Sequence, residues 1–487
     1  MSSRPVIDAV VVGAGPNGLA AAIELARAGS SVHVIEASGT PGGGTRSAEL
    51  TLPGFVHDVC SAIHPLGRTS PFFRSVDLER HGLRWIDPPA LLAHPLDGGR
   101  VATVEQDLAV TAAGLGADGG PVGRHDGAAY RDLFGPLVRD WDRLQPAVLG
   151  PFRIPLDPRR AVPLARFGLL ALQPAATLAR RFRGDAARAV IAGVAAHSQL
   201  ALTEPISGAA ALVLLSQGHA DGWPFPAGGT GRLPAAMTAE LVAHGGTIET
   251  DRRIERIEDL PDHRVALFDV TPRQLLEIAG DRFRGRYRSA LERFRYGVGT
   301  FKLDIALDGP IPWAADEAGR AGTVHVGGTF EEIARAEHEV ARGRVPDRPF
   351  VLLAQPSRFD RSRVPGTGET VWAYCHVPNG SPVDMTEPIL RQIERFAPGF
   401  RDRILAVAAT DPAALEAYNA NDVGGDITGG RMDLRQLFTR PSLRLFDPYA
   451  TPDRRIFFCS ASTPPGGGIH GMSGSHAARS AAHQLRS

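Results

Sequence analysis

Apolar runs and amphipathic stretches alternate at the start of the chain. Residues 9–12 are apolar, residues 19–27 repeat apolar side chains at helical spacing, and residues 31–35 alternate before ending at Glu36. These periods predict a strand, a helix and a second strand. Together they form a βαβ unit, the building block of a parallel sheet.

The same periodicities predict the rest of the chain in blocks. Two strands are expected around the turn at 97–99, helices from 126 to 218, and a helix at 233–243 followed by strands at 247–250, 254–257 and 265–268. Strands at 299–305 and 371–376 alternate with helices at 331–342 and 387–396. A buried strand at 455–459 and a terminal helix at 472–485 follow. Strands interleaved with helices indicate the α/β class.

The loop between the first strand and helix carries Gly13, Gly15 and Gly18. In this spacing the first glycine permits a tight turn, the second lets the backbone approach a pyrophosphate, and the third lets helix and strand pack closely. The helix N-terminus offers unpaired N–H groups to phosphate charge. Seventeen residues separate Gly18 from Glu36, which places the acid where it receives ribose hydroxyls. The segment therefore predicts a dinucleotide site.

A second glycine-rich junction between a strand and a helix lies at 466–471. A helix N-terminus there could direct its dipole at the N1–C2=O edge of a flavin, where negative charge gathers on reduction. No second strand, glycine fingerprint, helix and acid follow one another elsewhere in the sequence. These observations favour FAD over NAD(P) as the cofactor.

Three blocks resemble one family. They are the N-terminal fingerprint with Glu36, the block 226–229 with its helix and Ile254, and the block 464–476 with its Gly-Ile-His-Gly-Met-Ser-Gly-Ser run. On these blocks the chain resembles the carotenoid (phytoene) desaturase and flavin amine oxidase superfamily over nearly its whole length. The resemblance implies an α/β fold: an FAD-binding domain of glutathione-reductase type (Rossmann-like) with an interleaved α+β substrate domain carrying a helical cap.

The sequence patterns of the FAD-binding domain and the substrate domain alternate along the chain, so each domain is predicted to consist of separate segments. The FAD-binding domain is expected at 1–82, 226–293 and 441–487. The substrate domain is expected at 83–225, which holds the helical cap, and at 294–440, which holds a mixed sheet.

The resemblance also implies cofactor contacts. Arg46 would lie near the pyrophosphate, the backbone of Ile254 would meet the adenine, and residues 469–472 would lie against the isoalloxazine. The chain departs from the family where Gly44 follows the glycine pair in place of an arginine, and where Ala461 replaces an acid before the last glycine loop. The expected cofactor-binding residues are Gly13, Gly15, Pro16, Asn17, Gly18, Glu36, Ala37, Gly43, Gly44, Arg46, Ser61, Ile254, Ser460, Gly468, His470, Gly471 and Met472.

Lys302 is the single lysine among 53 basic residues, a scarcity that nucleotide bias in the coding sequence explains. Its setting resembles the strand on which amine oxidases carry a lysine that holds a water at flavin N5, so we expect Lys302 near N5. An ammonium there could orient water and steer oxygen or proton transfer. The alternative is a strand lysine that faces solvent or pairs with Asp304.

Further polar side chains are candidates to line the site. Lys302, His64 and Tyr374 are the candidate catalytic residues. Cys60, His325 and His376 are further candidates, although single histidines on strands are also typical of locally hydrogen-bonded core residues.

Composition excludes several classes of protein. A chain of 487 residues with 43% hydrophobic content can bury more than one core. Zero net charge gives no reason to expect nucleic-acid binding. The three cysteines are far apart, and no histidines have metal-ligand spacing, so we expect no disulfide framework and no metal. Without a signal-peptide core or a bilayer-length apolar span, we expect a cytoplasmic protein.

Residues 164–172 and 178–183 combine apolar and basic side chains, as an interfacial helix would. The interpretation we favour is packing of a cap helix on its own domain, because snorkelling arginines are ordinary at a protein surface. Peripheral contact with a membrane stays open, as does the oligomeric state.

We therefore expect an FAD-dependent oxidoreductase that removes a hydride from a largely apolar small molecule and forms a double bond, with O2, a quinone or another carrier as electron acceptor. The first alternative is an amine oxidase that produces an imine and H2O2, favoured by Lys302. The second is a non-catalytic protein similar to the GDP-dissociation inhibitors, which bind prenylated partners. The intact glycine fingerprint and Glu36 disfavour this last class.

Overall fold

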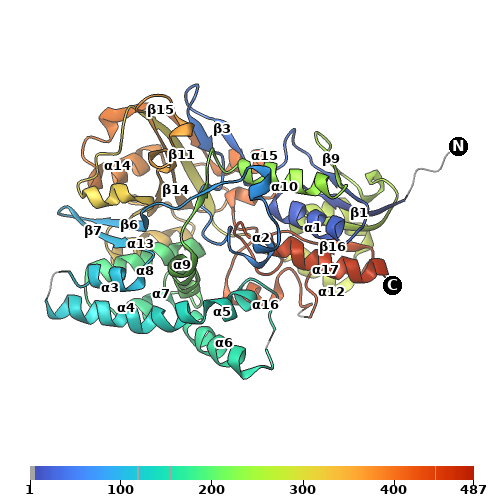
Figure 1. The fold of residues 1–487 in the computed structure, drawn as a ribbon, viewed down its shortest axis with the longest axis horizontal. Helices are drawn as coiled ribbons and strands as arrows, with labels where there is room; N and C mark the ends of the chain where they lie inside the picture. The colour runs from blue at the N-terminus through green and yellow to red at the C-terminus, as the bar shows by residue number, and fades with distance from the viewer. Residues whose placement is uncertain (1–5, 118–119, 154, 445, 487) are drawn as a thin grey trace.

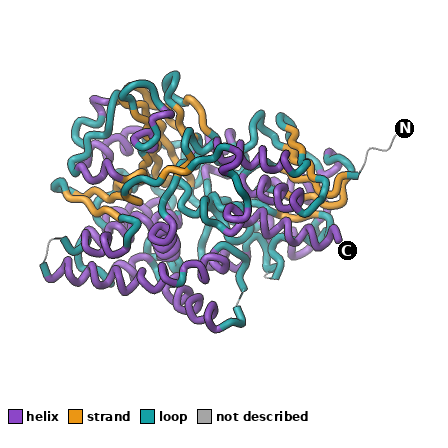
Figure 2. The backbone as a smooth tube through the Cα atoms, viewed as in Figure 1, coloured by secondary structure: helices purple, strands orange, loops and turns teal. Residues whose placement is uncertain are grey.

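Two large sheets, with helices packed on their faces, form most of the fold (Figures 1 and 2), and two short two-stranded sheets complete it. The computed structural model describes residues 6–117, 120–153, 155–444 and 446–486. In Figure 1 the smaller sheet lies with both chain termini on the right, the larger sheet lies at the upper left, and the helices of the cap lie below it. The expected α/β fold is confirmed.

The smaller sheet has five parallel strands in the order β16-β10-β1-β2-β9. The strands are β1 (Ile7–Val12), β2 (Val32–Ile35), β9 (Thr247–Glu249), β10 (His263–Phe268) and β16 (Ile456–Phe458). The side chains of consecutive residues in a strand point to opposite faces of the sheet. Val11 therefore packs against the helices on one face, and Val10 packs against the helices on the other. The first face carries α1 (Pro16–Arg27), α10 (Arg232–Ala243) and α17 (Met472–Arg486), and the second carries α11 (Pro272–Ala279) and α12 (Gly285–Glu292).

The larger sheet has seven strands in the order β15-β11-β14-β13-β12-β6-β7, with β12 and β6 the parallel pair. The strands are β6 (Ala90–Leu96), β7 (Arg100–Val104), β11 (Gly299–Leu307), β12 (Ala321–Val326), β13 (Val351–Ala354), β14 (Glu369–Val377) and β15 (Ile404–Thr410). Its outer face buries Leu303 and Ile305 against α14 (Thr386–Phe396). Its inner face buries Trp372 and Tyr374 against the cap.

The cap follows the first two strands of this sheet. It consists of α3 (Leu108–Gly114), α4 (Pro121–Arg139), α5 (Trp141–Val148), α6 (Pro158–Ala171), α7 (Ala175–Ala179), α8 (Asp185–Ala195) and α9 (Ser207–Asp221). The helical prediction for 126–218 is confirmed, and helix begins earlier, at Leu108. The remaining elements are β3 (Ser47–Glu49), β4 (Val56–Asp58), β5 (Trp85–Ile86), β8 (Phe225–Pro226), α2 (Pro71–Ser75), α13 (Phe330–Ala341), α15 (Pro412–Tyr418) and α16 (Leu434–Thr439).

The predicted strand at 254–257 is wrong. These residues form a loop that runs into a 3-10 turn, Ile257–Asp259. The Asp259 carboxylate accepts hydrogen bonds from the backbone N–H groups of Glu255 and Arg256, at 3.3 and 2.8 Å. Because this local bonding occupies those donors, they are not available to a strand ladder. The domain boundaries drawn from the sequence stay a prediction.

Candidate dinucleotide site and neighbouring active-site face

The first glycine loop has the geometry that its spacing predicts. Gly13 has a φ of +97°, a conformation that favours glycine. A Cβ on Gly18 would lie 2.1 Å from the carbonyl oxygen of Gly13, so α1 could not begin so close to β1 with a larger residue. Pro16 is the first residue of α1, where a missing N–H costs nothing.

A buried carboxyl group, Asp269, lies under this loop. It directly follows β10, and its Oδ2 accepts a hydrogen bond of 2.8 Å from the backbone N–H of Gly18. A Cβ on Gly15 would lie 2.7 Å from the same oxygen. Burial, with a smaller contribution from the charge of Glu36, raises the pKa of Asp269 to about 7. A proton is therefore held directly beneath the glycine loop near neutral pH.

Glu36 follows β2 and holds the other end of the loop. Its Oε2 accepts from the Ala14 N–H at 2.7 Å, and its Oε1 accepts from the Ser38 N–H at 2.9 Å. Arg46 also contacts Oε1, at 3.3 Å, and its guanidinium lies 5.3 Å from the centre of the Tyr418 ring. Arg46 is thus held at the Glu36 end of the site, and each carboxylate oxygen keeps lone-pair capacity for a ligand hydroxyl.

The N-terminal turns of α1 and α17 are in contact. A Cβ on Gly474 would lie 1.8 Å from the carbonyl oxygen of Asn17. His470 Nδ1 accepts the Met472 N–H at 3.0 Å, and burial lowers the pKa of His470 to about 4, which keeps the ring neutral. Asn17 Oδ1 is buried and has no hydrogen-bond partner among the described residues. Two helix N-termini brought together favour negative charge in the ligand.

The other expected cofactor residues border the same loops. A Cβ on Gly43 would lie 3.1 Å from the Gly15 Cα, so the loop of residues 42–44 packs closely against the loop of residues 13–18. Ile254 is buried in the cluster that contains Ile35 of β2. The remaining residues are Ala37, exposed beside Glu36; Ser61, whose N–H donates to the Gly44 carbonyl at 2.9 Å; Ser460, whose hydroxyl accepts the Ser462 N–H at 3.1 Å; and Gly468 and Gly471, both with positive φ.

Lys302 lies on the inner face of the larger sheet, and its ammonium pairs with Asp304. Both side chains are buried, so the interpretation as a solvent-facing lysine is wrong, and pairing with Asp304 is confirmed. Burial raises the pKa of Asp304 to about 6. His57 Nδ1 lies 3.6 Å from Asp304 Oδ1, and burial together with the Lys302 charge lowers the pKa of His57 to about 3. The Lys302 charge also acts on the Cys60 thiol, which lies next to Gly44.

Tyr374 and His376 lie on the same inner face. The strand register sets Tyr374 opposite Lys302 and His376 opposite Thr300. The two rings are 5.6 Å apart between centroids. His376 Nδ1 contacts Glu337 Oε2 at 2.9 Å, whereas its Nε2 is buried without a partner among the described residues. Burial raises the pKa of the Tyr374 hydroxyl.

The other candidates make local contacts. Both ring nitrogens of His64 have partners, Thr230 Oγ1 at 2.6 Å and Ser61 Oγ at 3.3 Å, and burial lowers its pKa to about 4. His325 contacts His197 of the cap at 3.0 Å between Nε2 atoms, and burial lowers its pKa. Burial raises the pKa of the Cys60 thiol, so the reactive thiolate is disfavoured.

Sequence reasoning missed an ion-pair network beside the site. Arg363 is fully buried and contacts Asp58 Oδ2 at 2.6 Å, Asp360 Oδ2 at 3.1 Å and the Pro226 carbonyl at 3.0 Å. Asp58 Oδ1 also accepts the Thr230 N–H at 2.7 Å. The network joins β4 to the block 226–231, and the only sequence signal for it was an acid directly after His57.

Comparisons with known proteins agree with this geometry. Residues 11–76 match the family of NAD(P)-binding Rossmann-like domains. Pyridine nucleotide-disulfide oxidoreductase domain-containing protein 2 of Rattus norvegicus is 25% identical over 98% of this chain and 93% of that protein. Phytoene dehydrogenase of Streptomyces griseus is 26% identical over 82% of this chain and 78% of that protein.

Among solved structures, wild-type putrescine oxidase bound to putrescine matches with a TM-score of 0.62 at 18% identity, over 99% of both chains. This likeness concerns the fold. The resemblance expected from the sequence is therefore confirmed: residues 11–76 match a Rossmann-like domain, a phytoene dehydrogenase is similar over most of the chain, and amine oxidases share the fold.

Proposed function

We propose that the protein is an FAD-dependent oxidoreductase that removes a hydride from a largely apolar small molecule and forms a double bond. Dioxygen, a quinone or another carrier would be the electron acceptor. The observation that carries the proposal is the contact between the first turns of α1 and α17 beside the carboxylate of Glu36. Relatives along nearly the whole chain are oxidoreductases.

The residues present fit an FAD-type dinucleotide. The loop 13–18 would hold the diphosphate with its backbone N–H groups, and Glu36 would accept hydrogen bonds from the ribose. The unpartnered Oδ1 of Asn17 can accept from a cofactor hydroxyl. Residues 469–472 would lie against the ring system, at the positive end of α17. FAD held there would supply two-electron oxidation of a substrate C–H bond.

The inner face of the larger sheet provides the side chains for substrate and proton. Trp372, Phe350 and Leu352 belong to the apolar cluster shared with the cap, and this favours an apolar substrate and excludes water. Forming a double bond also releases a proton from the substrate. We assign its acceptance to His376 Nε2, since Nδ1 is already held by Glu337.

Oxidation of an amine is the second candidate, and Lys302 is the observation that favours it. Its ammonium is buried on the inner face, one strand away from Tyr374, and is held by Asp304. An ammonium fixed in this way can orient a water molecule or dioxygen beside the reacting atoms.

The test begins with purified protein loaded with FAD and kept free of oxygen. We expect polyenes or cyclic enone precursors to bleach the yellow flavin absorbance, and simple amines to leave it unchanged. Bleaching by amines alone, with H2O2 formed on readmission of air, would establish the second candidate instead. A colourless protein that cannot take up FAD would overturn both candidate reactions and would favour the non-catalytic binding protein instead.

A further inference from the structure

Exposed apolar side chains gather on two segments, one around α6 of the cap and one that includes α16. Of 17 large apolar side chains that are exposed among the described residues, ten lie in two short segments. They are Phe152, Leu156, Val162, Leu169 and Leu172 in the first segment, and Leu434, Leu437, Phe438, Leu443 and Phe446 in the second. Single exposed apolar residues need no explanation, but ten on two segments do.

The two segments are joined by an aromatic contact. The rings of Phe152 and Phe438 meet edge to face at 5.6 Å between centroids. Residues 152–153, 155–183, 434–444 and 446 therefore form one surface, which we call the basic apolar face. Figure 1 shows α6 at the lower edge of the molecule, away from both sheets.

The expected packing of α6 on its own domain is confirmed only in part. Phe167 is the one buried residue of the helix, and Leu164 and Leu170 are partly buried against the cap core. Val162 and Leu169 remain 68% and 71% exposed. Self-packing therefore does not account for the apolar residues on the outer side of α6.

Nine exposed arginines and one exposed carboxylate, Asp157, lie among these apolar side chains. Neither 158–183 nor 434–444 contains an acidic residue. Within the described part of the chain none of the nine makes an ion pair, whereas other surface arginines, such as Arg68, Arg264 and Arg395, pair with carboxylates. The nine are Arg153, Arg159, Arg160, Arg166, Arg180, Arg181, Arg183, Arg435 and Arg444.

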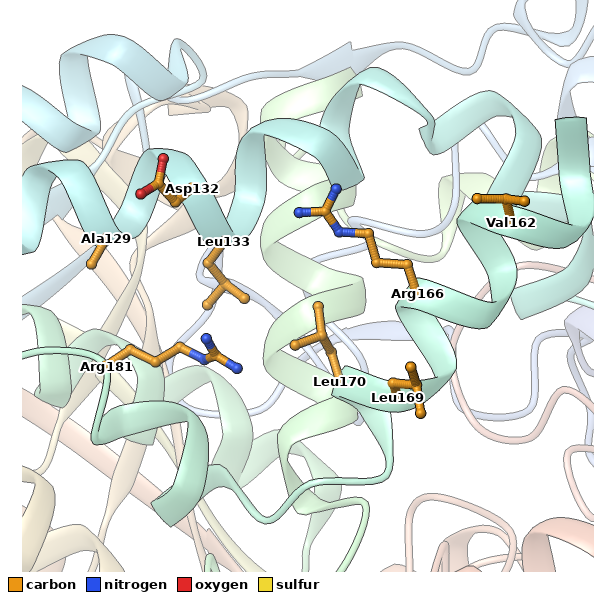
Figure 3. A pocket seen from close by; sticks show the side chains of 8 residues that line it. All are labelled: Ala129, Asp132, Leu133, Val162, Arg166, Leu169, Leu170 and Arg181. Atoms are coloured by element: carbon orange, nitrogen blue, oxygen red, sulfur yellow. The ribbon is translucent and has the colours of Figure 1, made fainter.

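A hollow of about 590 Å³ opens on this face between α4 and α6. Figure 3 shows the guanidinium groups of Arg166 and Arg181 directed into it from opposite sides, with Leu133 and Leu170 between them. Asp132 also lines it. Two cations above an apolar floor match an anionic headgroup with an acyl chain below it.

We propose that the basic apolar face docks the protein on a bilayer that contains anionic phospholipid. A second copy would bring nine arginines against nine arginines across a two-fold axis, and repulsion between like charges disfavours this. A nucleic acid would leave the ten apolar side chains in water. Among the described helices, none has an apolar stretch of the length that a bilayer span requires. The proposal does not depend on the proposed function.

The test is flotation of the full-length, FAD-loaded protein with two kinds of vesicle. We expect it to float with equimolar phosphatidylcholine and phosphatidylglycerol at low salt, and to stay behind with phosphatidylcholine alone. High salt should weaken binding, because the arginines near the surface are screened. Each arginine near an anionic surface strengthens binding about fivefold. The double change Arg166→Gln with Arg181→Gln should therefore weaken vesicle binding about thirtyfold.

Matched variants keep the test specific. Val162→Ser with Leu169→Ser should abolish flotation, whereas Val242→Ser with Leu405→Ser, at exposed positions elsewhere, should not. Arg342→Gln with Arg344→Gln removes the same charge from another exposed segment and should leave binding unchanged.

Three results would overturn the proposal. They are no flotation with the anionic vesicles, equal binding by the face variants and the controls, and a stable dimer in solution that Val162→Ser with Leu169→Ser dissociates. Flavin absorbance measured on the same samples shows whether each variant still folds and binds FAD. Failure of docking with full flavin content therefore leaves the proposed oxidoreductase untouched.

Discussion

Replacing Asp269 with asparagine separates the charge of this buried carboxyl from its shape. The side chain lies under the glycine loop, where its Oδ2 accepts the Gly18 N–H at 2.8 Å. Asparagine keeps an acceptor oxygen for this bond but cannot ionise. Because burial raises the pKa of Asp269 to about 7, the wild-type group is neutral below that pH and negative above it.

The raised pKa sets the size and sign of the effect on cofactor binding. A diphosphate at the loop repels the ionised carboxylate, so binding selects the protonated form. The apparent Kd then rises by a factor of 1 + 10^(pH − pKa), which is about 2 at pH 7 and about 11 at pH 8. Tenfold in Kd corresponds to about 1.4 kcal/mol. Wild-type affinity for FAD should thus fall as pH rises through neutrality, whereas Asp269→Asn should bind equally at both ends of this range.

Quenching of FAD fluorescence on binding to the apoprotein measures this directly. Titrations of wild type and Asp269→Asn at about pH 6, 7 and 8 give two profiles. We expect the curves to coincide at the acid end and to diverge about tenfold at the alkaline end, with the asparagine variant binding more tightly. Parallel profiles would refute the reasoning, because they would show that no proton at Asp269 is linked to the diphosphate.

Three further changes test other parts of the structure. Glu36→Ala should leave the purified protein almost free of flavin by absorbance, because the ribose acceptor is lost, whereas exposed Glu49→Ala should retain it. Lys302→Met should keep FAD bound and slow a half-reaction at least about tenfold in stopped-flow measurements, and unchanged rates in both half-reactions would remove Lys302 from the site. Arg363→Met should lower the free energy of unfolding in urea by about 3–5 kcal/mol, since it leaves two buried carboxylates without their cation. Exposed Arg361→Met is the control, and an equal loss there would contradict this assignment.

Local signals in the sequence predicted the parts of the site that are local in space. The glycines at 13, 15 and 18 and the acid at 36 belong to one βαβ unit, whose hydrogen bonds fix their spacing. Periodicity predicted α1, β10, β14 and α17 because each buries one face or both. The strand predicted at 254–257 failed because the Asp259 side chain takes the backbone donors, an interaction that hydrophobic periodicity does not register.

The polar interior was not predictable in the same way. Asp269 meets Gly18 across 251 residues, and Arg363 meets Asp58 across 305. Such partners are far apart along the chain and become neighbours only in the folded structure, so their charges carry no periodic or spacing signal. Lys302 shows the same limit, since its place on the inner face follows from strand alternation, whereas its distance to a bound flavin depends on how the two sheets meet.

The two carboxyl groups at the glycine loop show how environment, rather than residue type, divides the roles. Glu36 receives two backbone N–H groups and Arg46, and a carboxylate held by this set of donors is suited to bind hydroxyls. Asp269 accepts a hydrogen bond from the Gly18 N–H and is buried. Burial, together with the nearby charge of Glu36, raises its pKa to about 7. One acid is therefore suited to hold the ribose, and the other to remain neutral while phosphate charge approaches. That division follows from counting donors around each group, and the pH profile of Asp269→Asn measures it.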